Sequence, residues 1–163
     1  LEYDSRTRQE VYNDLKKVND DVSLSIYSIT DPETGFSALS GKSLSKTIMC
    51  NENGYYPIIV SDRYGFNNPD YEWNKKTQDI LIIGDSFAYG ACVNRPYDIS
   101  SVLRRITNKS VLNLGMEGNG PLIEYATFKE YFNKSIKKVL WIYFEGNDFY
   151  NLHLELKNKI LQK

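Results

Sequence analysis

Three short segments of the chain place polar residues and glycines directly after runs of apolar residues. They are GDSFAYG at 84–90, NLGMEGNG at 113–120 and EGND at 145–148. In open parallel sheets, ligands bind outside the carboxyl ends of the strands. If each apolar run forms such a strand, the three segments meet at one edge of the sheet and can act on the same molecule.

One residue type from each segment suits nucleophilic attack on a carbonyl group. A serine hydroxyl becomes a nucleophile when a base takes its proton and hydrogen-bond donors stabilise the oxyanion that forms. Ser86 stands where a strand gives way to a loop, Gly118 leaves its N–H unobstructed, and Asn147 offers a neutral amide donor. We therefore predict that Ser86, Gly118 and Asn147 form a catalytic group.

The apolar runs predict the elements that position these residues. DILIIG at 79–84, SVLNLG at 110–115 and KVLWIYFEG at 138–146 have the pattern of strands buried on both faces of a parallel sheet. Pro96 is expected at the first position of a helix between the first two, with Ile99, Val102, Leu103 and Ile106 on its apolar face. Gly120-Pro121 is expected to open another helix that runs through Phe132. This β-α-β-α-β order predicts an α/β fold of three layers with a parallel central sheet.

The first half of the chain has a different character. Thr7 and Glu10 form a capping-box pair, and the spacing of Val11, Leu15 and Val18 predicts an amphipathic helix over 7–19. From about 20 to 76 we expect an irregular extension with short β-strands in Val22 to Ile29 and Tyr55 to Val60. The predicted division is therefore an N-terminal helix and extension over 1–76, and an α/β domain over 77–163.

The three segments resemble the sequence blocks of the SGNH or GDSL hydrolases, over about residues 79 to 150. GDSFAYG resembles the first block with Ser86 as nucleophile, NLGMEG the second with its oxyanion glycine at Gly118, and FEGND the third with its oxyanion asparagine at Asn147. The resemblance implies a flavodoxin-like serine esterase. Its oxyanion hole consists of the Ser86 N–H, the Gly118 N–H and the Asn147 amide, and it needs no metal and no organic cofactor.

A further segment, SDRYGFNNPDYEW at 61–73, is similar to the lead-in found in some bacterial hydrolases of envelope or exported polysaccharide. We expect a small-molecule or carbohydrate acyl ester as substrate, and this similarity favours acyl groups on sugars and the bacterial periplasm or cell envelope. An acyltransferase is an alternative, because it shares the covalent intermediate. A non-catalytic glycan-binding or envelope-assembly module on the same scaffold is another.

The fourth block of the family, a DxxH segment that supplies the base, is missing from the sequence. The sole histidine is His153, and Tyr150 rather than Asp stands three residues before it. We interpret His153 as a surface or helix-packing residue, with a role as general base as the alternative. We expect the catalytic His and Asp to follow Lys163, in which case the chain alone hydrolyses esters poorly.

The composition excludes several other classes of function. A formal charge of −1 lacks the basic surface that nucleic-acid binding requires, and no apolar run is long enough to span a membrane. Cys50 and Cys92 are too few for a cysteine zinc site, and Cys92 is expected to be a small buried apolar residue. Asp85 and Asp148 are expected to stabilise their own loops through backbone hydrogen bonds. The oligomeric state stays open.

Overall fold

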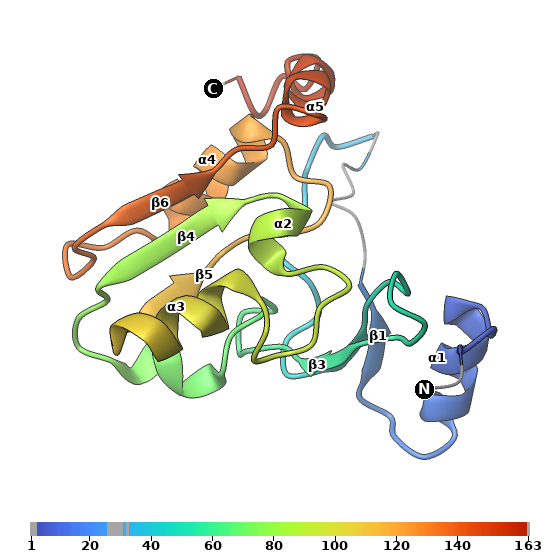
Figure 1. The fold of residues 1–163 in the computed structure, drawn as a ribbon. Helices are drawn as coiled ribbons and strands as arrows, with labels where there is room; N and C mark the ends of the chain where they lie inside the picture. The colour runs from blue at the N-terminus through green and yellow to red at the C-terminus, as the bar shows by residue number, and fades with distance from the viewer. Residues whose placement is uncertain (1–2, 26–30, 32, 163) are drawn as a thin grey trace.

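The computed structural model describes residues 3–25, 31 and 33–162, and its fold is mixed α/β (Figure 1). It contains a three-stranded parallel sheet flanked by helices and a separate small mixed sheet. Among the helices of the described residues, none has both the length and the apolar character to cross a membrane.

The parallel sheet has the strand order β5-β4-β6, and its three strands are β4 (Ile80–Gly84), β5 (Val111–Asn113) and β6 (Val139–Ile142). Each strand lies within one of the predicted apolar runs. Leu81 pairs with Leu112 of β5 and with Val139 of β6, so β4 is the central strand. The loop that carries Ser86 therefore begins in the middle of the sheet edge.

Helices cover both faces of this sheet, which explains why β4 is apolar throughout. Leu81 and Ile83 are fully buried on the face where Phe128 of α4 (Pro121–Tyr131) packs. Ile82 belongs to the opposite face, where Leu103 of α3 (Ile99–Thr107) packs. Side chains alternate between the two faces of a strand, so both must be apolar when both are covered.

The predicted start is confirmed for α4 but not for α3. Pro121 occupies the first turn of α4 as predicted, and Phe132 is its C-cap. The prediction for α3 was wrong, because its N-cap is Asp98, whose side chain accepts a hydrogen bond from the N–H of Ser101. Pro96 lies before the helix, in a cis peptide bond with Arg95.

The apolar face predicted for α3 is also only partly correct. Leu103 packs against the sheet, but Ile99 and Ile106 are exposed, with 37% and 67% of their surface accessible. Ser100 and Ser101 are buried instead. Ser100 donates a hydrogen bond to Asp98, and this local bond makes burial of a hydroxyl tolerable.

Strand β6 departs from the expectation of burial on both faces. Val139, Leu140 and Trp141 are each more than 40% exposed. Among the described residues, β6 pairs only with β4 and forms one edge of the sheet. The apolar run predicted a strand correctly, but its exposure depends on which elements cover it.

The N-terminal region forms α1 (Arg8–Lys16) and the small sheet of β1 (Val22–Leu24), β2 (Lys46–Ile48) and β3 (Ile58–Val60). The capping box predicted for α1 is present, since Thr7 and Glu10 each accept the other's backbone N–H. Val11 and Leu15 pack against this sheet, whereas Val18 lies beyond the helix and is 82% exposed. Of the predicted strand from Val22 to Ile29, the part over 26–29 lies outside the described residues.

The segment over 61–74, which ends in the 3₁₀ helix η1 (Asp70–Asn74), fastens this region to the parallel sheet. Phe66 is fully buried in the same core cluster as Leu81. Asn68 exchanges two hydrogen bonds with the backbone of Asn113, with its amide donating at 2.7 Å and its oxygen accepting at 2.8 Å. These bonds satisfy the backbone of β5 on the side where it has no neighbouring strand.

Candidate active site

The loops that follow β4, β5 and β6 lie at one end of the parallel sheet and contact one another (Figure 1). The N–H of Met116, after β5, donates to the carbonyl of Gly84 at 3.2 Å. The rings of Phe87 and Phe144, after β4 and β6, lie 4.6 Å apart between centroids. The three segments therefore converge, as parallel strands with this order require.

Ser86 is the first residue of the short helix α2 (Ser86–Tyr89) and is half-buried. The carboxylate of Asp85 accepts the N–H of Phe87 at 2.9 Å and thereby fixes the turn that presents Ser86. Gly84 is required before it, because a Cβ there would lie 2.6 Å from the carbonyl oxygen of Ile142. Within the described part of the chain, no hydrogen-bond partner reaches the Ser86 hydroxyl.

Ser86 lines a cavity of about 400 Å³. Gly118 lines a different cavity of about 620 Å³, which lies against α5 (Asp148–Glu155). Gly118 has a φ of +76°, a left-handed conformation that favours glycine at this position. The structure thus brings the three segments together but opens Ser86 and Gly118 toward separate hollows.

Asn147 is the N-cap of α5, yet its side chain makes no capping hydrogen bond. Its Oδ1 is buried and has no hydrogen-bond partner among the described residues. Asparagine at an N-cap ordinarily accepts a backbone N–H of the first turn. The Asn147 amide therefore makes no capping hydrogen bond to α5.

Asp85 and Asp148 have the structural roles expected from the sequence. Asp85 accepts from Phe87 as described, and Asp148 Oδ2 accepts the N–H of Phe144 at 2.7 Å. The remaining oxygen of each carboxylate is buried without a hydrogen-bond partner in the described residues. Burial raises the pKa of Asp148, and the charge of Asp85 raises it further.

Glu124 of α4 is a third buried carboxyl group near these two, and it was not among the predicted site residues. Its side chain is 1% exposed and accepts a hydrogen bond from Trp141 Nε1. Burial raises its pKa to about 8, and the charges of Asp148 and Asp85 act in the same direction. Burial therefore favours the neutral form of Glu124, which limits the negative charge near Asp148 and Asp85.

His153 lies on α5 and is exposed. No hydrogen bond of the described residues connects it to Ser86. The structure therefore does not join the sole imidazole of the chain to the predicted nucleophile.

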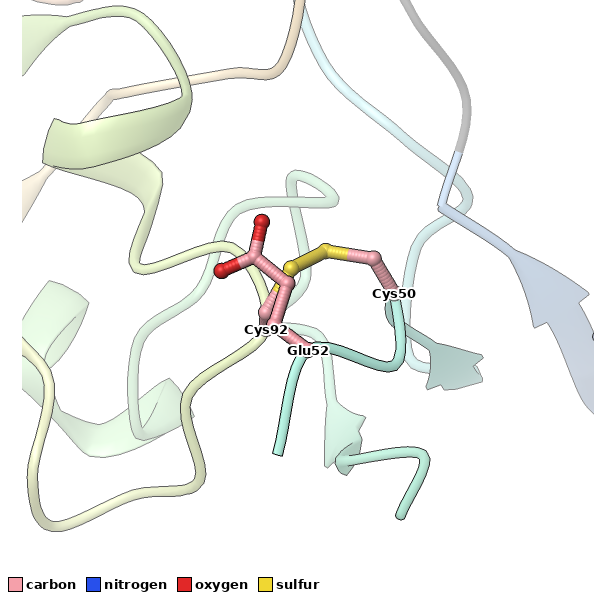
Figure 2. A group of neighbouring side chains, drawn as sticks. All are labelled: Cys50, Glu52 and Cys92. Carbon is pink, nitrogen blue, oxygen red and sulfur yellow. A yellow bond between two sulfur atoms is a disulfide. The ribbon is translucent and has the colours of Figure 1, made fainter. Parts of the chain in front are cut away.

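Cys50 and Cys92 form a disulfide, which the sequence analysis missed (Figure 2). Cys92 is buried as expected, but as half of this crosslink rather than as a free apolar side chain. Glu52 lies beside the disulfide, with one carboxylate oxygen within 4.8 Å of both sulfur atoms. Because the two sulfurs are bonded to each other, neither is a thiolate that could bind a metal ion.

Glu117 lines the Ser86 cavity together with the disulfide and was not among the predicted site residues. Its side chain is 3% exposed, and its Oε2 accepts a hydrogen bond from the Ser25 hydroxyl at 2.5 Å. The only sequence signal for Glu117 was its place directly before Gly118 in NLGMEG. That segment was interpreted through the backbone N–H of Gly118 and not through the side chain of Glu117.

We compared the chain with protein-family models, curated proteins and solved structures, and none of them matches it.

Proposed function

We propose that the protein is a serine ester hydrolase in which Ser86 attacks the carbonyl carbon of an acyl ester. The observation that carries the proposal is the position of Ser86. It follows the central strand of a parallel sheet, begins a helix, lines a cavity and has a hydroxyl without a partner in the described residues. This is the strand end at which open α/β sheets bind ligands.

In this proposal the reaction proceeds through an acyl-enzyme. The Ser86 oxygen forms a bond to the carbonyl carbon, the alcohol leaves with a proton, and water then releases the acid. The N–H groups of Ser86 and Gly118 and the Asn147 amide stabilise the oxyanion, which requires that Gly118 and Asn147 turn toward Ser86 when substrate binds. The residues named need no metal or organic cofactor.

The described residues that line the Ser86 cavity include no histidine that could serve as the base. We infer that the base is an imidazole, as in the hydrolases that the three segments resemble. Imidazole added to the solution can therefore replace it in a test. With p-nitrophenyl acetate as substrate, added imidazole should increase the acetylation of Ser86, measured by peptide mass spectrometry. Ser86→Ala removes the acceptor, and Ser5→Ala is a matched control at an exposed serine.

Acetyl-Ser86 that forms in the wild type and the Ser5→Ala variant, and turns over more quickly with imidazole, would support the proposal. The proposal would be overturned if hydrolysis above the rate of imidazole alone were unchanged in Ser86→Ala and the wild type carried no acetyl group on Ser86. That second result would favour the non-catalytic glycan-binding module, since a hydroxyl in a cavity can also bind a sugar.

A further inference from the structure

The cavity beside Ser86 has an unusual balance of charge. Three acidic residues line it, namely Glu52, Asp98 and Glu117. No lysine, arginine or histidine is among the described residues that line it. Low-dielectric walls that carry one sign of charge concentrate ligands of the opposite sign.

Glu117 is one of the two buried acidic residues of this cavity. One of its carboxylate oxygens accepts from Ser25, while the other, Oε1, lies 4.0 Å from the Cys50 sulfur. A disulfide sulfur carries no hydrogen, so this second contact is not a hydrogen bond. Over the part of the chain that the structure describes, no cationic side chain lies within 4 Å of Glu117. A buried carboxylate in this state gains from a cation that enters the cavity.

Glu52 lies beside the same disulfide (Figure 2), and its side chain is exposed. One oxygen of Glu52 lies within 4.8 Å of the Cys50 sulfur that Glu117 also approaches. The two carboxylates therefore lie beside the same sulfur atom of the disulfide. A cation next to the disulfide would interact with both.

Asp98, the third acidic residue of the cavity, has a structural role. Its Oδ1 accepts from Ser100 and from the N–H of Ser101, and it caps α3. The positive charges of Arg95 and Arg104 also act on it. We therefore assign the binding of a cation to Glu117 and Glu52 alone.

The other walls of the cavity show what kind of cation fits. Phe87, Tyr97 and Ile99 contribute apolar surface, and all three are exposed. Aromatic rings attract organic ammonium groups, whereas Ca²⁺ and Mg²⁺ require six or more oxygen ligands. A hollow of about 400 Å³ also has room for a substituted ammonium group.

We propose that this cavity binds an organic ammonium group, with Glu117 as the buried ionic contact and Glu52 at the rim. The substrate of Ser86 is then an ester whose alcohol carries a positive charge, and this second statement rests on the proposed function. The ammonium group would bind beside the disulfide, so that the ester carbonyl reaches Ser86 in the same cavity.

The first experiment measures binding and does not depend on hydrolysis. Choline and its neutral isostere 3,3-dimethylbutan-1-ol are titrated into the chain by calorimetry. We expect choline to bind about tenfold more tightly or more, and Glu117→Gln to reduce this preference to about twofold or less. Equal binding of the two alcohols by the wild type would overturn the inference.

Two further variants separate a charge effect from loss of structure. Glu52→Gln changes an exposed side chain and should lower choline binding by about threefold without an effect on thermal stability. Glu145→Gln removes the same charge from an exposed loop residue outside the cavity and should leave the preference for choline unchanged. A loss of preference in Glu145→Gln equal to that in Glu117→Gln would assign the effect to net charge and contradict a local site.

The second experiment compares acetylcholine with 3,3-dimethylbutyl acetate as substrates, with imidazole present. A kcat/KM that favours acetylcholine in the wild type and not in Glu117→Gln supports the inference. Equal rates that depend on Ser86 would overturn the charged substrate and leave the serine hydrolase intact. Choline binding that depends on Glu117, without hydrolysis of either ester, would support the ammonium site and overturn the hydrolase.

Discussion

The indole Nε1 of Trp141 donates a hydrogen bond of 2.5 Å to Oε2 of Glu124, which joins β6 to the first turn of α4. The other oxygen of Glu124 is buried without a hydrogen-bond partner in the described residues. Charge on this group is therefore unfavourable, and burial raises its pKa from 4.5 to about 8. Glu124 also interacts electrostatically with Asp148, the residue after Asn147, so its protonation state bears on the stability of the candidate site.

This pKa predicts that the protein loses stability as the pH rises through the neutral range. The folded state holds the proton of Glu124 up to about pH 8, whereas the unfolded chain releases it near 4.5. The contribution is therefore fully present below pH 4.5 and is lost as the pH rises to about 8. The free energy of unfolding should fall by at most about 1.4 kcal/mol per pH unit in this range.

Urea denaturation at several pH values between 5 and 9 measures this slope. Glu124→Gln keeps an oxygen that can accept from Trp141 but has no proton to lose, so it should flatten the profile. Asp148 and Glu155 also have raised pKa values and act with the same sign, which leaves a residual slope in the variant. Glu130→Gln, exposed on the same helix, serves as control, and an identical slope in all three proteins would contradict the role of Glu124.

The disulfide between Cys50 and Cys92 predicts a strong dependence of stability on redox conditions. It closes a loop across 42 residues, and a crosslink of this span stabilises a fold by about 4 kcal/mol in the chain-entropy model. Reduction should lower Tm by several degrees and weaken choline binding, because Glu117 and Glu52 border the crosslink. The double variant Cys50→Ser, Cys92→Ser should melt at the reduced temperature with or without reductant. A Tm that dithiothreitol does not change would argue against the crosslink.

Asn68 should be among the most sensitive positions in the first half of the chain. Its amide donates to Asp62 and to the carbonyl of Asn113, and its oxygen accepts from Asn113 and Arg104. Asn68→Leu leaves these buried groups without partners, and each costs about 1 to 3 kcal/mol. We expect a loss of about 3 to 5 kcal/mol in the free energy of unfolding, measured by urea denaturation. Asn13→Leu changes an exposed asparagine on α1 and should cost far less, so equal losses would contradict the role of Asn68.

The sequence predicted those features that depend on neighbouring residues. The capping box of Thr7 and Glu10 and the proline at the start of α4 are local signals, and both occur as expected. The three parallel strands were also predictable, because burial between two layers requires an unbroken apolar run. Pro96 failed as a helix start because Asp98, two residues later, satisfies the first backbone donors of α3.

The remaining features depend on contacts between distant segments. Nothing near Cys50 in the sequence indicates that Cys92 lies beside it. Glu117 likewise becomes a site residue only because Ser25 and the disulfide pack around it. Exposure of β6 could not be foreseen either, since the same apolar residues would suit a central strand. The position of Ser86 after a strand of the parallel sheet was therefore predictable, whereas its surroundings were not.

Asn147 provides the most direct test of the proposed oxyanion hole. Its side chain does not cap α5, so Asn147→Ala should change Tm little while it removes one donor to the oxyanion. We expect kcat for p-nitrophenyl acetate, with imidazole present, to fall by about 100- to 1,000-fold with a small change in KM. Asn13→Ala, at an exposed asparagine of α1, is the control and should retain its kcat. An unchanged kcat in Asn147→Ala would exclude this amide from the oxyanion hole, whereas a large drop in Tm would assign the residue a structural role instead.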